Sequence, residues 1–213
     1  MPEVKIIVLD CDGVILETVA AKTRAFSTLF ERYGEEAKRK MVDYHLAHGG
    51  ISRFAKFAWF YREVLGRDIT DDEKEELGCI FSRCCFDEIM NAPAVPGAIQ
   101  FISSYYDRIP LYVASGTPYE ELTEILKARN LTRFFKQVYG SPPGKTEILA
   151  GIVRRARVSP KEALMVGDSS TDLEAAESVG TLFYGRGSGF SNSEWPWGED
   201  LTELDNYLQK AQQ

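Results

Sequence analysis

Two carboxylates separated by a single residue follow an apolar run near the start of the sequence. Asp10 and Asp12 come directly after residues 4–9, which read VKIIVL and predict a buried parallel strand. Side chains alternate along a strand, so both carboxylates can converge beyond its carboxyl end, where open α/β sheets bind ligands. Gly13 then permits a sharp turn. Two carboxylates this close favour a Mg²⁺ site or an acid/base pair sharing a proton, with a simple strand-ending turn as the alternative.

A hydroxyl and a glycine follow a second predicted strand. Ser115 and Gly116 come after residues 110–114 and before a predicted helix. Free backbone N–H groups at such a helix start favour an anion. An ordinary helix start, with Thr117 as N-cap and Pro118 at the first helical position, explains the same residues equally well.

Lys145 lies at a third strand-to-helix junction, in the stretch GSPPGKT. This stretch is one residue shorter than a P-loop, and its two prolines remove N–H donors, so the sequence disfavours an NTPase. Lys145 could still bring a positive charge to a phosphate from the helix start. The alternative is a solvated surface lysine.

A second acidic pair follows a fourth predicted strand, in GDSSTD. Asp168 lies at the strand end and Asp172 one turn into the next helix, so both can face one cleft. Capping of that helix is the alternative role. It would leave the acids of the first strand unexplained.

The elements that position these residues predict an α/β fold. Short apolar strands alternate with amphipathic helices after residue 93, a βαβ succession typical of a doubly wound, Rossmann-like parallel sheet. We therefore expect residues 1–15 and 93–213 to form the α/β core and residues 16–92 to form a helical insertion. We expect residues 188–199 to be an irregular loop. The expected helices of the insertion and the later strands span residues 18–33, 36–48, 51–65 and 71–90, and residues 110–114, 137–139, 163–166 and 181–184.

Composition limits the function classes. The chain has 213 residues, 44% of them hydrophobic, and a formal charge of −7, which disfavours nucleic-acid and anionic-membrane partners. The sequence has no basic, apolar leader at its start and no apolar stretch near the roughly 20 residues that span a bilayer. The spacing of the four cysteines fits no zinc pattern. We expect a cytoplasmic protein with reduced thiols, in which Cys11 packs in the core.

The order of these motifs resembles the haloacid dehalogenase (HAD) superfamily. D-x-D-G-V, S-G-T, a lysine at a helix start and G-D-x-x-x-D are similar to the pattern of its phosphatases with a helical cap, the phosphoglycolate phosphatase and β-phosphoglucomutase-like branch. The resemblance implies that Asp10 is the nucleophile, forming an aspartyl-phosphate. It implies that Asp12 protonates the leaving oxygen and then activates water. Mg²⁺ would be held by Asp10, Asp168 and the Asp12 carbonyl.

The resemblance assigns the remaining motif residues to phosphate binding and support. Ser115, Gly116 and Lys145 would bind the transferring phosphoryl group. Asp172 would support the metal or Lys145.

The insertion then corresponds to the family's cap domain, residues 16–92. Its segment 45–53 carries both histidines of the chain and Gly49-Gly50 between two helices, and it resembles the cap specificity loop. His48, Gly50 and Arg53 are the candidate substrate-specificity residues, with a solvated turn as the alternative. Residues 50–53 also resemble the loop with which sugar-phosphate mutases bind a second phosphate, but Lys22 stands where those mutases carry a histidine.

The resulting prediction is a Mg²⁺-dependent phosphatase acting on a small phosphorylated metabolite. A sugar phosphomutase is the nearest alternative, and a non-catalytic phospho-ligand-binding protein is another. A dehalogenase is disfavoured because those relatives lack the second acid. The sequence predicts neither the substrate nor the oligomeric state.

Overall fold

The fold is built on one parallel sheet of six strands. The structure, a computed structural model, describes residues 3–211. Its strands follow the order β3-β2-β1-β4-β5-β6, with β1 near the centre, and every pair is parallel. Their bounds are β1 Ile6–Leu9, β2 Leu111–Pro118, β3 Gln137–Ser141, β4 Ala163–Gly167, β5 Leu182–Arg186 and β6 Trp197–Gly198.

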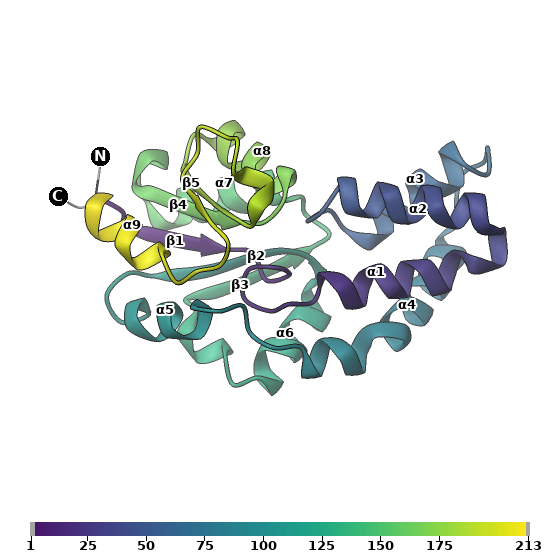
Figure 1. Cartoon of the computed structure of the whole chain (residues 1–213), viewed down its shortest axis with the longest axis horizontal. Coiled ribbons are helices and arrows are strands. Elements are labelled where there is room, and N and C mark those ends of the chain that lie inside the picture. The colour runs from purple at the N-terminus through teal and green to yellow at the C-terminus, as the bar shows by residue number, and fades with distance from the viewer. Residues whose placement is uncertain (1–2, 212–213) are drawn as a thin grey trace.

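Helices cover both faces of this sheet. Ile6 and Val8 of β1 belong to the apolar cluster under α7 (Lys145–Ala156) and α8 (Ser170–Val179). Ile7 and Leu9, which point the other way, pack in the cluster with three further helices, α5 (Ala98–Tyr105), α6 (Tyr119–Ala128) and α9 (Leu204–Ala211). Figure 1 shows α7 and α8 on one side of the sheet and α5 and α6 on the other. The doubly wound fold is therefore confirmed.

The segment between β1 and β2 forms a helical cap. Its first four helices extend beyond the carboxyl end of β1, toward the right of Figure 1. Their apolar faces meet in an aromatic cluster that includes Phe26, Phe30, Phe57, Phe60 and Phe81. This aromatic cluster is continuous with the apolar core on one face of the sheet, so the cap packs as an extension of that core. These helices are α1 Val19–Phe30, α2 Glu35–Ala47, α3 Arg53–Glu63 and α4 Asp71–Asn91.

Local signals explain most element boundaries. α4 begins with a capping box in which Thr70 and Glu73 satisfy each other's backbone N–H groups. Short 3₁₀ turns complete the connections, at Glu31–Tyr33, Thr132–Phe134, Pro160–Glu162 and Ser188–Phe190. Within residues 3–211 no helix combines the length and apolar character needed to cross a membrane.

One expectation about the chain after β5 was wrong. The stretch 188–199 is not wholly irregular, because Trp197 and Gly198 pair with Gly185 and Arg186 as the edge strand β6. Two residues are too few to show a strand pattern in the sequence.

Candidate active site

The strand register brings the sequence motifs together. Leu9, the last residue of β1, pairs with Val113 of β2 and with Val166 of β4. The residues just beyond these positions therefore reach the same sheet edge. Asp10, Ser115 and Asp168 are among them.

The turn after Asp10 depends on glycine. Gly13 has φ +75°, and a Cβ there would lie 2.0 Å from Oδ2 of Asp168. Only glycine permits both the backbone conformation and the close approach of that carboxylate. Asp168 can thus lie against the loop that carries the first acidic pair.

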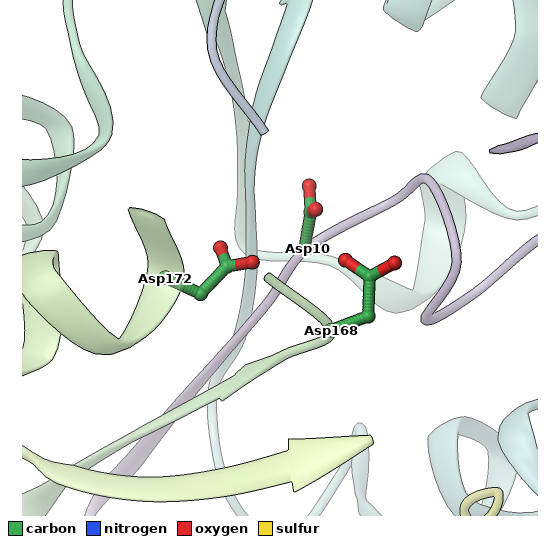
Figure 2. A group of neighbouring side chains, drawn as sticks. All are labelled: Asp10, Asp168 and Asp172. Atoms are coloured by element: carbon green, nitrogen blue, oxygen red, sulfur yellow. The ribbon is translucent and has the colours of Figure 1, made fainter. Parts of the chain in front are cut away.

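Three carboxylates converge at this edge. Asp10, Asp168 and Asp172 each place an oxygen within 4.8 Å of the others (Figure 2). Burial and the nearby carboxylates raise the pKa of Asp10 well above its ordinary value despite Lys145, and burial with Asp172 raises the pKa of Asp168 to about 7. The cluster holds more negative charge than its protein cations offset.

Lys145 provides the positive charge nearest Asp10. Its Nζ lies 2.7 Å from Oδ2 of Asp10 and also pairs with Asp172. Burial alone would lower the pKa of Lys145, but the two carboxylates outweigh it and raise that pKa, so the side chain stays an ammonium. Asp172 also accepts from the backbone N–H and hydroxyl of Ser169 as part of a capping box. Helix capping and lysine binding, which the sequence left as alternatives, are both present.

The donor set fits a divalent cation. The four aspartates of this edge face two ammonium groups, those of Lys22 and Lys145, which leaves a formal charge of −2. Carboxylate oxygens are hard ligands suited to Mg²⁺. Asp10, Asp168 and Asp172 are therefore the residues that could hold a metal ion.

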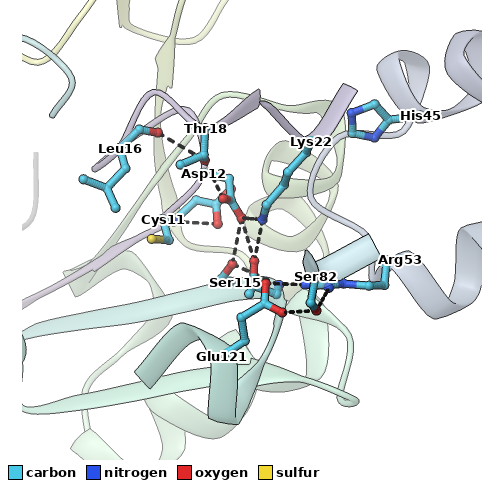
Figure 3. A network of polar contacts seen from close by, with 12 residues as sticks. Cys11, Asp12, Leu16, Thr18, Lys22, His45, Arg53, Ser82, Ser115 and Glu121 are labelled. Atoms are coloured by element: carbon cyan, nitrogen blue, oxygen red, sulfur yellow. Dashed lines mark hydrogen bonds and ion pairs between the residues drawn. The ribbon is translucent and has the colours of Figure 1, made fainter. Parts of the chain in front are cut away.

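Asp12 lies in a separate polar network, shown in Figure 3. Thr18 donates to its Oδ1 at 2.5 Å, and Lys22 and Thr117 contact its Oδ2 at 2.6 and 2.8 Å. Burial alone would raise the pKa of Asp12, but Lys22 and the hydroxyl donors outweigh it and hold the pKa well below its ordinary value. The carboxylate is thus fixed in position and ionised.

Ser115 and Gly116 lie between this network and the cap. The Ser115 hydroxyl is buried, donates to Asp12 at 3.3 Å and accepts from the N–H of Thr117. A Cβ on Gly116 would lie 2.2 Å from the carbonyl oxygen of Gly50. Thr117 does not cap α6 with its side chain, because β2 continues to Pro118 and that hydroxyl turns to Asp12. The alternative interpretation, an ordinary helix start with Thr117 as N-cap, is therefore wrong.

The cap loop closes directly over the strand ends. Gly50 has φ +77°, and a Cβ there would lie 2.6 Å from Nζ of Lys145 and 2.3 Å from Oγ1 of Thr171. Thr171 also donates to the carbonyl of Gly49 at 2.6 Å. Between cap and core lies a cavity of about 350 Å³. It is lined from the core by Asp12, Gly116, Thr117, Asp168, Ser169 and Ser170, and from the cap segment by Val19, Lys22, Phe26, His45–Ala47, Gly49–Ile51, Arg53, Lys56 and Phe81.

Two of the candidate specificity residues of the cap, Arg53 and His48, contact other side chains of the protein. Arg53 lines the cavity, but its guanidinium pairs with Glu121 of α6 at 2.5 Å and donates to Ser82 at 2.8 Å (Figure 3). His48 stacks on Tyr44 and is not among the described residues that line the cavity.

The sequence reasoning missed several residues of the site. Thr18 and Thr117 bind Asp12, and His45 and Lys56 face the cavity from the cap. Lys56 follows Arg53 by three residues on one helix, a spacing that puts both on the same face and could have pointed to it.

Comparisons with known proteins agree with this geometry. The chain is 26% identical over 180 residues to a phosphorylated carbohydrates phosphatase of Thermotoga maritima, covering 82% of this chain and 81% of the relative. It is 22% identical to a phosphoglycolate phosphatase of Vibrio parahaemolyticus, covering 90% and 87%. In fold it is similar to a β-phosphoglucomutase of Clostridium difficile, with a TM-score of 0.79, 18% identity and 97% and 96% coverage.

A sequence model of the haloacid dehalogenase-like hydrolases matches residues 4–180. That range contains both acidic pairs, Ser115, Lys145 and the whole cap. The chain is therefore an enzyme that belongs to the haloacid dehalogenase-like hydrolases.

Proposed function

We propose that this enzyme is a Mg²⁺-dependent phosphatase that hydrolyses a small phosphate monoester through an aspartyl-phosphate on Asp10. The observation that carries the proposal is the environment of Asp10, buried at the strand end between Lys145 at 2.7 Å and the carboxylates of Asp168 and Asp172. An anionic nucleophile can approach an anionic phosphoryl group only where positive charge is concentrated. The named relatives, a sugar-phosphate and a phosphoglycolate phosphatase, support this activity.

The residues of the site divide the steps of the reaction among them. An oxygen of Asp10 attacks phosphorus as the bond to the leaving oxygen breaks. Asp12, ionised in the absence of ligand, takes up a proton when the negatively charged substrate binds beside it, and this proton passes to the leaving oxygen. Water next attacks the phosphorus, the bond to Asp10 breaks, and Asp12 takes the proton of the water. The Ser115 hydroxyl, the backbone at Gly116 and the Lys145 ammonium bind the phosphoryl oxygens.

Asp10 and Asp168, with the carbonyl of Asp12, are the proposed ligands of Mg²⁺, and Asp172 supports Lys145. Bound there, Mg²⁺ would neutralise the excess negative charge of the phosphoryl group and the carboxylates. The core is proposed to comprise residues 1–15 and 93–213, and the cap residues 16–92. The cap would exclude water during transfer, and a cavity of about 350 Å³ suits a small metabolite.

The test is turnover of a panel of phosphate esters, including phosphoglycolate, hexose phosphates and nucleotides, with Mg²⁺, Ca²⁺ or chelator. We expect phosphate release with Mg²⁺, little with Ca²⁺ because its looser coordination misplaces the nucleophile, and none with chelator. Full turnover in chelator would contradict the proposal. Isomerisation of a sugar phosphate without phosphate release would instead identify a phosphomutase.

A further inference from the structure

Lys56 is a buried cation of the cap without a carboxylate partner. Lys56 is only 3% exposed, yet it lines the cavity between cap and core. Among the residues that the structure describes, no carboxylate oxygen lies within 4.0 Å of its Nζ. Burying an uncompensated charge is costly, so such a residue is normally paired or binds a ligand.

The contacts that Lys56 does make are with neutral groups. Its Nζ lies 2.8 Å from Nδ1 of His45 and 5.5 Å from the centre of the Phe26 ring. The other nitrogen of His45 lies 3.1 Å from the hydroxyl of Thr23, which donates to the carbonyl of Val19. This chain of hydrogen bonds assigns the His45 proton to Nε2 and leaves Nδ1 to accept from Lys56. His45 therefore orients the ammonium without neutralising it.

The other cations of the cavity are already paired. Lys22 contacts Asp12 at 2.6 Å, and the Arg53 guanidinium is bound by Glu121. Lys145 pairs with two carboxylates below the Gly50 loop. Lys56, which also donates to the carbonyl of His45 at 3.4 Å, is thus the cation of this cavity whose charge no carboxylate of the described chain compensates, and one of its three donors remains for a ligand.

Position decides which part of a ligand Lys56 would meet. The phosphoryl group is assigned to the strand ends, whereas Lys56 approaches the cavity from α3, on the cap side. A side chain on the cap side contacts the leaving group rather than the phosphoryl group. One ammonium beside a neutral histidine matches a single negative charge, that of a carboxylate, better than the higher charge of a second phosphate.

We infer that Lys56, oriented by His45, is a specificity-determining residue that binds a carboxylate on the leaving group of the substrate. The substrate class is thus the phosphate esters of small hydroxy acids. The inference rests on the proposed phosphatase function, and it deepens it by naming the substrate class. A bound carboxylate would supply the counter-charge that Lys56 lacks.

Binding of non-hydrolysable phosphonates tests the inference without turnover. Phosphonoacetate and its amide, phosphonoacetamide, differ in one negative charge, and calorimetry with Mg²⁺ present measures both dissociation constants. We expect the wild-type protein to prefer the acid by about 10- to 100-fold, since a hydrogen bond between charged groups contributes that much. Lys56→Met should abolish the preference and Lys56→Arg should retain part of it. Lys40→Met, on the exposed side of α2, is the matched control and should leave it unchanged.

The outcomes separate the inference from the function on which it rests. If the wild type hydrolyses p-nitrophenyl phosphate but does not distinguish the two phosphonates, the phosphatase proposal stands and the role of Lys56 is refuted. Equal weakening of both ligands in folded Lys56→Met would also refute it, because that result indicates a packing role. Tighter binding of ethylenediphosphonate than of phosphonoacetate would overturn the carboxylate assignment. A wild type that neither binds phosphonates nor hydrolyses esters would overturn both proposals.

Discussion

The acidic edge of the sheet and the inner face of the cap handle charge in opposite ways. At the edge, Asp10 and Asp172 share Lys145, and Asp12 pairs with Lys22, at contact distances of 2.7 Å or less. In the cap, Lys56 is buried against a neutral histidine, and within the described chain no carboxylate oxygen lies within 4.0 Å of its Nζ. Chemistry common to all substrates can be preorganised by protein charges. Selection among substrates is more effective where the counter-charge must come from the substrate itself.

The acidic edge and the inner face of the cap also differ in the backbone elements that carry their side chains. The acids of the edge follow strands or begin a helix, and their positions are fixed by the sheet register and by Gly13. The cap side chains are carried on helices that meet the core through a few contacts, such as Thr171 with Gly49 and Glu121 with Arg53. Substitutions in the edge should therefore change the rate of the chemical step. Substitutions in the cap should change substrate affinity and closure.

The largest expected effect is that of Asp10→Asn. An amide cannot serve as the nucleophile, so we expect kcat to fall by more than about 10⁴-fold. The measurement is phosphate release together with acid-quenched phosphoenzyme, which should disappear. The circular dichroism spectrum and the urea unfolding midpoint of the variant are the controls for folding. Hydrolysis near the wild-type rate would show that the nucleophile is another residue.

A smaller effect at the edge is expected for Asp12→Asn, which removes proton transfer but keeps the nucleophile. We expect kcat to fall by about 10²–10⁴-fold for an alkyl phosphate, whose leaving oxygen needs a proton. Phosphoenzyme formation from p-nitrophenyl phosphate should be much less affected, because nitrophenolate leaves without protonation. A rapid-quench time course compares the two substrates. Equal losses in phosphoenzyme formation from both would argue against Asp12 as the acid.

The Arg53–Glu121 pair lies between the two regions, and its loss should have an intermediate effect. The guanidinium bridges α3 of the cap to α6 of the core and is almost fully buried. We expect Arg53→Ala and Glu121→Ala each to raise KM about tenfold for acidic and neutral esters alike, since either change leaves a partner unpaired and weakens closure. The double variant should be no worse than the single ones.

The measurement is the KM of each variant, from steady-state kinetics, for phosphoglycolate as the acidic ester and p-nitrophenyl phosphate as the neutral one. A loss confined to the acidic ester, in Arg53→Ala only, would mean that Arg53 leaves Glu121 and binds the substrate itself. That result would support the role suggested by the sequence.

The sequence predicted which residues lie at the strand ends, but it did not predict which of their side chains contact one another. Asp10, Ser115, Lys145 and Asp168 were identifiable because each follows a locally recognisable strand or begins a helix. The doubly wound parallel sheet and the helical insertion also followed from the alternation of elements, whereas the short strand β6 lacked enough residues for any pattern.

Contacts between distant segments explain the rest. Lys22 meets Thr117 and Arg53 meets Glu121 across 95 and 68 residues of sequence, and no local pattern encodes such pairs. Since the partnership with Glu121 cannot be recognised in the sequence, Arg53 next to Gly49-Gly50 suggested a free ligand-binding group. Lys56 was missed for the converse reason, because its lack of a counter-charge is visible only in the folded cap.

The smallest expected effect concerns the stability of the cap and follows from the unpaired ammonium. Burial, with Lys22 nearby, lowers the pKa of Lys56 from 10.5 to about 7. Between these values the unfolded chain binds more protons than the folded one, so the contribution of Lys56 to stability rises with pH across that window. The full cost of the buried charge is present below pH 7. The charged and titratable groups that face it are Lys22 on α1, His45 on α2, and Asp12, Lys145 and Asp168 of the core.

Lys56→Met should therefore stabilise the protein without ligand, by roughly 1–3 kcal/mol near pH 6.5, because it removes a buried charge at little cost in volume. The gain should shrink as pH rises and level off above about pH 10.5, where the lysine loses its proton in the unfolded chain as well. Urea unfolding at pH 6.5, 8.5 and 10 measures it, with Lys40→Met as a control whose exposed charge should give no such trend. A gain independent of pH would mean that Lys56 carries no uncompensated charge in the folded cap, and the contrast between the two regions would then fail at its central residue.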